Sequence, residues 1–140
     1  TDFEEKIDRM YELKQYFLRE ISVLPEVTIN GLPEKCTDAF EMEQIKKTAP
    51  HIMSVSFGGV RSEVLLHALE EKGIYVSAGS ACSSHHPQPS VTLKAIGLPK
   101  NLMDSTLRFS MSDRTTREEI DYTLEQIKKL LPVLRKYTRK

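Results

Sequence analysis

The sequence lacks a net charge. It has 20 basic and 20 acidic residues, so its formal charge is zero when the histidines are neutral. A chain without a basic excess has no global field to hold a nucleic acid or an anionic membrane, and neither partner is expected. The basic residues of 135–140 are interpreted as a solvated, frayed terminus rather than a binding patch.

The sequence also lacks the features of secreted and membrane proteins. It contains no secretory signal segment and no apolar run of membrane length. Its two cysteines, Cys36 and Cys82, are too few for a disulfide framework. The chain is therefore predicted to be cytoplasmic and reduced. A disulfide between these two cysteines is the alternative, although Cys36 lies in a polar stretch and is expected to be incidental.

An initiator methionine, internal repeats and a glycine-rich phosphate loop are absent as well. The length of 140 residues suits one domain with a sizeable core. Because the sequence begins at Thr1 and enters a helical pattern at once, we expect a piece of a longer protein.

Apolar residues at helical spacing predict helices, and alternating apolar residues predict strands. Helices are predicted at residues 2–21, 60–72 and 90–97, and from about 116 onward. Strands are predicted at residues 26–30, 51–57, 74–76 and 106–111. The polar connection 32–50 is long for a compact domain, which indicates function, mobility or an element that the pattern does not reveal.

The last helix carries two possible capping boxes and an internal proline. Either Thr115 with Glu118 or Thr116 with Glu119 begins it, and Pro132 is expected to bend or end it. Since strands and helices mix without strict alternation, the sequence favours an α+β fold of two layers, with helices packed on a small, mostly antiparallel sheet.

Small residues surround Cys82. Residues 77–84 read Ser-Ala-Gly-Ser-Ala-Cys-Ser-Ser, and His85 and His86 follow. This composition has no periodicity and predicts a mobile loop, which suits a nucleophile that travels. A free thiol has a pKa of about 8.5, so the two histidines are candidates for activating it. The alternative is that Cys82 is a small buried apolar residue, the commonest state of a free cysteine.

Arg108, His67 and the pair of Cys82 with His85 are further candidates for a functional site. Arg108 is predicted to point away from the core, and from the residues alone a solvent-facing arginine is the simplest interpretation. His67 has no partner at ligand spacing. Cys82 and His85 form a C-x-x-H pair, but no second ligand pair accompanies them, so no metal site is expected.

Five segments that follow one another in the sequence carry a resemblance to a known family. They read SAGSACSS at 77–84, PQPS at 87–90, LKAIGL at 93–98, TLRFS at 106–110 and TTREEID at 115–121. Together they resemble the cysteine desulfurases, which belong to the class-V aminotransferases, and more narrowly the long-loop group that supplies sulfur for iron–sulfur cluster assembly. The resemblance covers residues 50–140 in detail and the earlier part more loosely.

The resemblance implies the small C-terminal domain of a fold-type-I pyridoxal-phosphate enzyme. Residues 1–22 would be a linker or packing helix, and residues 23–140 the domain that carries the cysteine loop 77–89. The large domain that holds pyridoxal phosphate is absent from the sequence, so no residue here is assigned to the cofactor. The chain alone is accordingly expected to be inactive.

The resemblance also implies roles for individual residues. Cys82 would take sulfur from L-cysteine as a persulfide, leaving L-alanine, while Arg108 holds the substrate carboxylate and pyridoxal phosphate acts as electron sink. His85 and His86 depart from the family pattern and receive at most an auxiliary role. The implied partners are an iron–sulfur scaffold or another sulfur acceptor, and a second copy of the chain in a homodimer.

A second hypothesis is a free-standing sulfur carrier. Such a domain would receive a persulfide on Cys82 and have no catalysis of its own. An upstream cofactor domain in the complete gene would favour the enzyme, and a true start near Thr1 would favour the carrier.

Overall fold

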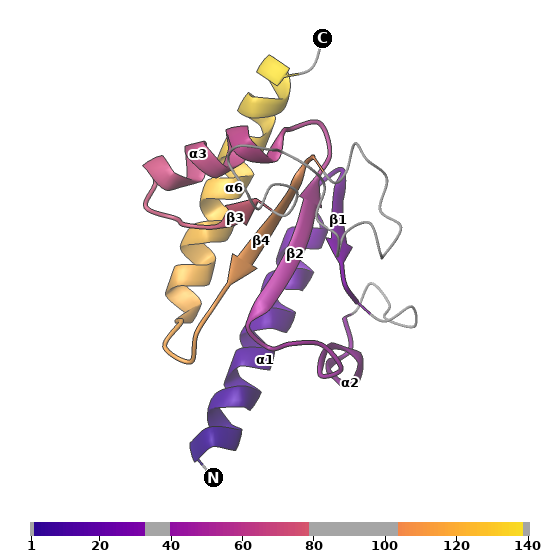
Figure 1. Cartoon of the computed structure of the whole chain (residues 1–140), viewed down its shortest axis with the longest axis vertical. Helices are drawn as coiled ribbons and strands as arrows, with labels where there is room; N and C mark the ends of the chain where they lie inside the picture. Colours follow the sequence, from indigo (N-terminus) through magenta and orange to yellow (C-terminus); the bar gives the residue numbers. More distant parts are fainter. Residues whose placement is uncertain (1, 33–39, 79–103, 139–140) are drawn as a thin grey trace.

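A computed structural model describes residues 2–32, 40–78 and 104–138 of the chain. Its elements, in chain order, are α1 (Asp2–Ser22), β1 (Val27–Asn30), α2 (Met42–Ile45), β2 (Ile52–Phe57), α3 (Ser62–Glu71), β3 (Ser77–Ala78), β4 (Thr106–Ser110) and α6 (Arg117–Thr138) (Figure 1). In the described part of the chain, no helix is both long and apolar enough to cross a membrane.

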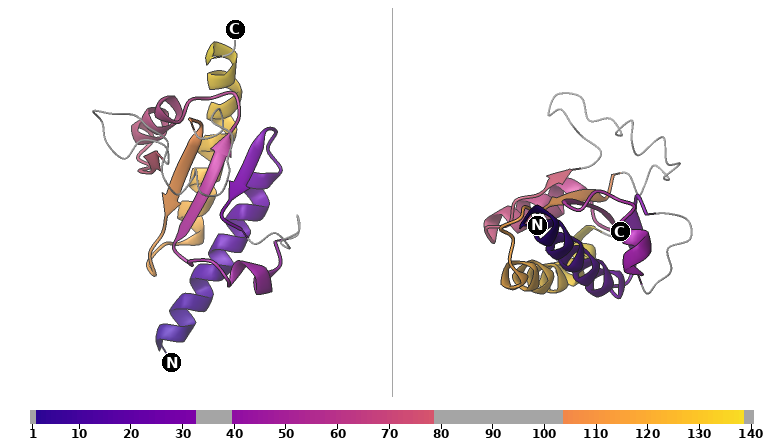
Figure 2. Two further views of the ribbon diagram at one scale, coloured as in Figure 1. Left: turned by 45° about the vertical axis from the view of Figure 1, so that its right-hand side comes forward. Right: turned by 90° about the horizontal axis from the view of Figure 1, so that it is seen from below.

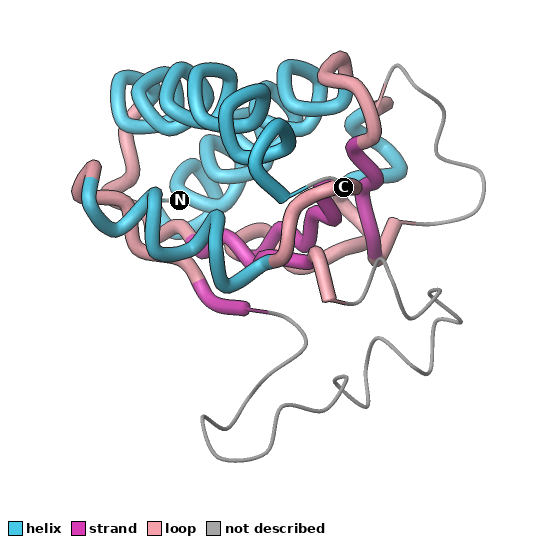
Figure 3. The backbone as a smooth tube through the Cα atoms, turned by 90° about the horizontal axis from the view of Figure 1, so that it is seen from above, coloured by secondary structure: helices cyan, strands magenta, loops and turns pink. Residues whose placement is uncertain are grey.

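The four strands form one sheet in the order β1-β2-β4-β3, and every neighbouring pair is antiparallel. Helices α1 and α6 lie side by side against one face of this sheet (Figure 2, right). The view from above shows the two long helices on one side of the strands, whereas α3 lies beside β3 (Figure 3). The predicted α+β fold, with helices on a small antiparallel sheet, is confirmed.

The core lies between these two helices and the sheet. Met53, Val55 and Phe57 alternate inward from β2 and are at most 5% exposed. The rings of Phe17 on α1 and Phe109 on β4 are 5.1 Å apart between centroids. Full burial of each such side chain contributes roughly 1.5–3 kcal/mol, so this contact fixes α1 on the sheet.

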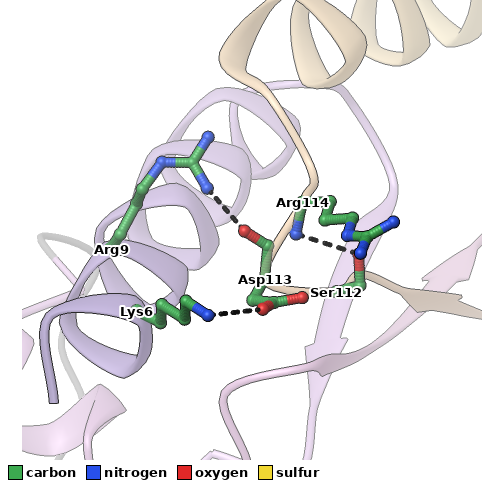
Figure 4. Close-up of polar contacts among 5 residues, drawn as sticks. All are labelled: Lys6, Arg9, Ser112, Asp113 and Arg114. Carbon is green, nitrogen blue, oxygen red and sulfur yellow. Dashed lines mark hydrogen bonds and ion pairs between the residues drawn. The ribbon is translucent and has the colours of Figure 1, made fainter. Parts of the chain in front are cut away.

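Contacts outside the core also join α1 to the turn that follows β4 (Figure 4). The Arg9 guanidinium donates to the carbonyl oxygens of Asp113 at 3.0 Å and Thr115 at 2.7 Å. Lys6 forms an exposed ion pair with Asp113 at 3.6 Å, which contributes little on its own because both groups are solvated. These bonds hold the end of β4 and the start of α6 against α1.

Helix α3 ends where the sequence predicts, because Gly73 adopts a left-handed conformation with φ of 81°. The Ile74 N–H donates to the carbonyl of Leu69 at 2.9 Å, and the Gly73 N–H donates to that of Glu70 at 3.0 Å. This pair of bonds is the Schellman motif, and the buried side chains of Ile74 and Leu69 supply its usual apolar contact.

The predicted strand at 74–76 is wrong. The Ile74 N–H still belongs to the end of α3, and the ladder begins only where Ser77 pairs with Arg108. Strand β3 is therefore Ser77–Ala78. The first two residues of the predicted loop 77–84 consequently form a strand, and the rest of that loop lies outside the described residues, as does the predicted helix 90–97.

The long connection 32–50 contains an element that the pattern does not reveal. Helix α2 is a single short turn whose Ile45 is fully buried. The Gln15 side chain on α1 donates to the carbonyl of Phe40 at 2.8 Å, and Tyr11 donates to that of Thr48. Tertiary contacts with α1, rather than local periodicity, hold this segment.

Helix α6 begins with the second of the two possible capping boxes. The Thr116 N–H donates to Glu119 Oε1 at 2.8 Å, and the Glu119 N–H donates to Thr116 Oγ1 at 3.2 Å. The helix continues past Pro132 to Thr138, so it does not end at the proline.

The interpretation of residues 135–140 as a frayed terminus is wrong for Arg135. Its Nε donates to the carbonyl of Gly58 at 2.8 Å, and its Nη2 donates to that of Pro25 at 2.7 Å. Arg135 thereby ties the end of α6 to the ends of β1 and β2, because its long stem reaches orphan carbonyls at that edge.

Candidate functional site

Of the four predicted site residues, the structure describes only Arg108. Cys82, His85 and His86 lie outside the described residues, and so does Cys36. His67 is an exposed residue of α3 whose Nδ1 lies 3.5 Å from Glu70 Oε1. No group of three or more His, Cys, Asp or Glu side chains that could hold a metal ion occurs among residues 2–32, 40–78 and 104–138.

Arg108 projects from the face of the sheet opposite α1 and α6. Its neighbours Leu107 and Phe109 are buried against those helices, whereas Arg108 is exposed, as the alternation of the strand predicts. Strand register gives the other members of this face, which we call the polar face: Thr28, Asn30, Ile52, Ser54, Ser56, Ser77, Thr106 and Ser110.

The polar face carries no acidic side chain on its described strand residues. Within the described part of the chain, the Arg108 side chain has no hydrogen bond or ion pair. A guanidinium with five N–H donors and no internal partner suits a planar anion such as a carboxylate. The site can therefore accept an anionic ligand from outside the described residues.

Hydrogen bonds between side chains hold the part of the polar face that lies beside Arg108. Asn30 Nδ2 donates to Ser56 Oγ at 2.9 Å and to Ser54 Oγ at 3.4 Å. Ser56 Oγ and Thr106 Oγ1 lie 2.6 Å apart, and both residues are fully buried. This row crosses three strands and gives the polar face a fixed, uncharged surface.

The strand that leads into the cysteine segment lies beside Arg108. Ser77 is paired with Arg108 and Ala78 with Leu107 (Figure 1). Strand β3 is short and forms the edge of the sheet, and Cys82 follows Ala78 by four positions in the sequence. The family resemblance implies that Arg108 and Cys82 act on one substrate, and the register places Arg108 beside the strand that leads to Cys82.

Lys14 is a buried lysine that was not predicted from the sequence. Its side chain lies between α1 and the segment before β2, where Nζ donates to Thr48 Oγ1 and to the carbonyl of Ala49, both at 2.7 Å. Burial lowers the pKa of Lys14 from 10.5 to about 8. Lys14 follows Met10 by four residues and precedes Phe17 by three, so it shares the buried face of α1 with them. This spacing is the feature of the sequence that could have predicted its burial.

The described residues do not fit a pyridoxal-phosphate site. Such a site needs a lysine that reaches a cavity, and Lys14, the one buried lysine of the described residues, is instead bound to Thr48 and Ala49. No lysine lines the pocket between the start of α6 and residues 73–76, or the pocket between α1 and Arg117.

A cavity of about 410 Å³ lies on the other side of the sheet from Arg108. It opens between the start of α6 and the segment from Gly73 to Val76, and its lining is mainly apolar with Glu118 at its edge. Arg108 is not among its lining residues. This cavity is thus separate from the predicted substrate position.

Comparison with known proteins gives the family. The sequence pattern described as aminotransferase class-V matches residues 1–123. The chain belongs to the class-V aminotransferase family. Enzymes of this family generally depend on pyridoxal phosphate, so the predicted family and its general cofactor are confirmed.

Curated relatives of this class-V aminotransferase chain are cysteine desulfurases. It is 41% identical over 127 residues to cysteine desulfurase IscS of Proteus mirabilis (strain HI4320), which covers 91% of this chain and 28% of the relative. It is 38% identical over 130 residues to cysteine desulfurase IscS of Pectobacterium carotovorum subsp. carotovorum (strain PC1), covering 93% of this chain and 29% of that one. The chain thus spans less than a third of the length of these relatives.

Solved structures agree with this family. A NifS-like protein superposes with a TM-score of 0.67 at 26% identity, covering 91% of this chain and 28% of its own. A NifS-like protein from Rickettsia africae ESF-5 gives a TM-score of 0.66 at 16% identity, covering 91% and 29%. The second likeness concerns the fold alone, which is that of a part of a fold-type-I enzyme.

Proposed function

We propose that this chain works as the C-terminal domain of a pyridoxal-phosphate-dependent cysteine desulfurase. The domain would convert L-cysteine to L-alanine and take up the sulfur as a persulfide on Cys82. The observation that carries the proposal is the pairing of Ser77 with Arg108, because it brings the strand leading to Cys82 beside a guanidinium that has no partner among the described residues. The similarity to cysteine desulfurases over more than nine-tenths of the chain supports the same reaction.

Arg108 binds the substrate carboxylate in this proposal. Two parallel N–H···O bonds from its fork fix the substrate in orientation as well as in place. The uncharged row of Asn30, Ser54 and Ser56 provides no competing anion on the described polar face. The substrate thiol then projects from a carboxylate anchored on β4.

Cys82 removes the sulfur atom. Its thiolate forms a bond to the substrate sulfur, the substrate C–S bond breaks, and the electron pair left on carbon takes up a proton to give L-alanine. One thiol and one L-cysteine become one persulfide and one L-alanine, so no outside oxidant is needed. Since Cys82 follows Ala78 by four residues, its Cα stays within about 14 Å of that of Ala78 in any conformation.

Pyridoxal phosphate is held, in this proposal, by a large domain outside this chain. Residues 1–22 pack as a linking helix and residues 23–140 form the small domain that carries the cysteine segment 77–89. His85 and His86 have an auxiliary effect on the Cys82 thiolate at most. The complete protein is a cytoplasmic homodimer that passes its persulfide to an iron–sulfur scaffold or another acceptor, and this chain alone is inactive.

The complete gene product, supplied with pyridoxal phosphate and L-cysteine, tests this function. Replacing Cys82 with Ser removes the sulfur acceptor, so we expect alanine formation to fall by at least about a hundredfold. Cys36→Ser is the matched control and should keep the rate within about twofold. A Cys82→Ser protein that forms alanine and transfers sulfur at the normal rate would overturn the proposal.

A further inference from the structure

Ser54 lies directly opposite Arg108 across the pair of β2 and β4. The Phe57 N–H donates to the carbonyl of Ser105 at 2.9 Å, which identifies 57 and 105 as a hydrogen-bonded pair. Such pairs alternate along an antiparallel ladder, so Ser54 and Arg108 form a non-hydrogen-bonded pair, with Cα atoms about 4.5 Å apart. Opposite side chains approach each other most closely in pairs of this type.

A second pair of the same type confirms this alternation. Ser56 and Thr106 are also opposite each other, and their hydroxyl oxygens lie 2.6 Å apart. A side chain at position 54 with an acceptor at its tip would meet the Arg108 stem and guanidinium in the same way. Position 54 is therefore one of the two described positions directly across from Arg108, the other being Ser77 on β3.

The residue found there is small and neutral. Ser54 Oγ accepts a long hydrogen bond of 3.4 Å from Asn30 Nδ2, and no hydrogen bond joins it to Arg108 in the described part of the chain. No acidic residue occupies the described polar face, and the guanidinium has no partner among the described residues. An exposed arginine beside an acidic cross-strand neighbour would instead form an internal ion pair.

We infer that Ser54 is a specificity-determining residue, whose neutral side chain opposite Arg108 leaves the guanidinium fork available to the carboxylate of the substrate. The inference rests on the proposed function, which gives Arg108 that ligand. An acidic side chain at position 54 competes for the fork and repels a bound carboxylate. Ser54 acts through Arg108 and takes no part in sulfur transfer.

Three substitutions in the complete protein test this inference. Ser54→Asp should raise the KM for L-cysteine about tenfold and leave kcat within about twofold, because it weakens binding of the carboxylate alone. Ser54→Asn has a similar shape without the charge and should change KM by less than about threefold. Thr28→Asp places the same charge on the same face two strands and two residues along from Arg108, about 12 Å away, and should behave like Ser54→Asn.

The inference is judged by comparing the KM for L-cysteine among these variants. The inference is overturned if Ser54→Asp raises the KM for L-cysteine no more than Thr28→Asp does. It is also overturned if Ser54→Asn raises this KM as much as Ser54→Asp does. Ser54→Glu carries its charge further from the sheet and should raise the KM for L-cysteine in the same way. It replaces Ser54→Asp in the test if the Ser54→Asp protein does not fold.

A measurement independent of turnover separates this inference from the proposed function. Phenylglyoxal labels arginine, and mass spectrometry of the Arg108 peptide reports whether L-alanine protects it. In the unaltered protein, L-alanine should protect Arg108 from labelling. In Ser54→Asp, half of this protection should require an L-alanine concentration about tenfold higher. This result supports the inference even if desulfurase activity is absent. If L-alanine protects Arg108 equally in the two proteins, the inference is overturned and the proposed function stands. If it protects Arg108 in neither protein, the inference and the proposed function are both overturned.

Discussion

Lys14 is a buried cation held by two neutral acceptors. Thr48 Oγ1 itself donates to the carbonyl of Ile45, so it accepts from Lys14, as the Ala49 carbonyl does. An uncharged amine has two N–H groups, which match these two acceptors. Both hydrogen bonds therefore survive when Lys14 loses its proton, and burial favours that neutral form.

Lys14 should make stability depend on pH in the alkaline range. Its folded pKa of about 8 lies below the model value of 10.5, so between these values the unfolded chain binds more protons than the folded one. Stability therefore rises with pH across this window, by roughly 1–3 kcal/mol in total. Urea unfolding from pH 7 to pH 10.5 should show this rise in the unaltered chain relative to Lys14→Met. Parallel pH profiles for the two chains would contradict the assignment.

At the same scale, strand alternation predicted correctly that Arg108 points away from the core. The serines and the asparagine beside it were not predicted as part of a site. Their relation to Arg108 depends on the register between β1, β2 and β4, which brings together residues more than twenty positions apart. A sequence pattern within one strand contains no information on that register.

Among the elements, the end of α3 determines where the chain enters β3. Gly73 has φ of 81°, and a Cβ added there would meet nothing within 4 Å. The requirement for glycine is therefore conformational rather than steric. The prediction of this helix end succeeded because the signal is local, whereas the strand after it was misplaced because β3 is defined by its pairing with β4.

Replacing Gly73 with Ala should destabilise the chain by about 1–2 kcal/mol, since alanine is strained in the left-handed region. Gly73→Asn should cost clearly less, because asparagine tolerates this conformation. Urea denaturation midpoints of the three chains measure the difference. Equal stability of the alanine and glycine chains would show that Gly73 is not needed for the turn into β3.

For the whole molecule, periodicity predicted the two long helices and three of the four strands, together with the α+β class. It missed α2, whose single turn is held by contacts with α1, and of the two outcomes expected at Pro132 the end of the helix is wrong, because α6 continues to Thr138. Both errors arise where tertiary contacts outweigh local preference: Ile45 is fully buried in α2, and Arg135 anchors α6 beyond Pro132.

The two functional hypotheses differ in what they require of Arg108. A free-standing sulfur carrier has no need of a carboxylate site, whereas a desulfurase must bind its amino-acid substrate. The Arg108 guanidinium has no partner in the part of the chain that the structure describes, and it lies beside the strand that leads to the thiol, which favours the enzyme. The chain spans less than a third of its desulfurase relatives, so the complete gene product is the protein on which this proposal is tested.

Mass spectrometry of the Cys82 peptide tests the central claim most directly. The complete protein with pyridoxal phosphate is mixed with L-cysteine, the remaining thiols are blocked, and the peptides that contain Cys82 and Cys36 are compared. We predict a gain of one sulfur atom on Cys82, formed together with L-alanine, and none on Cys36. A protein that forms L-alanine while Cys82 gains no sulfur would contradict the account.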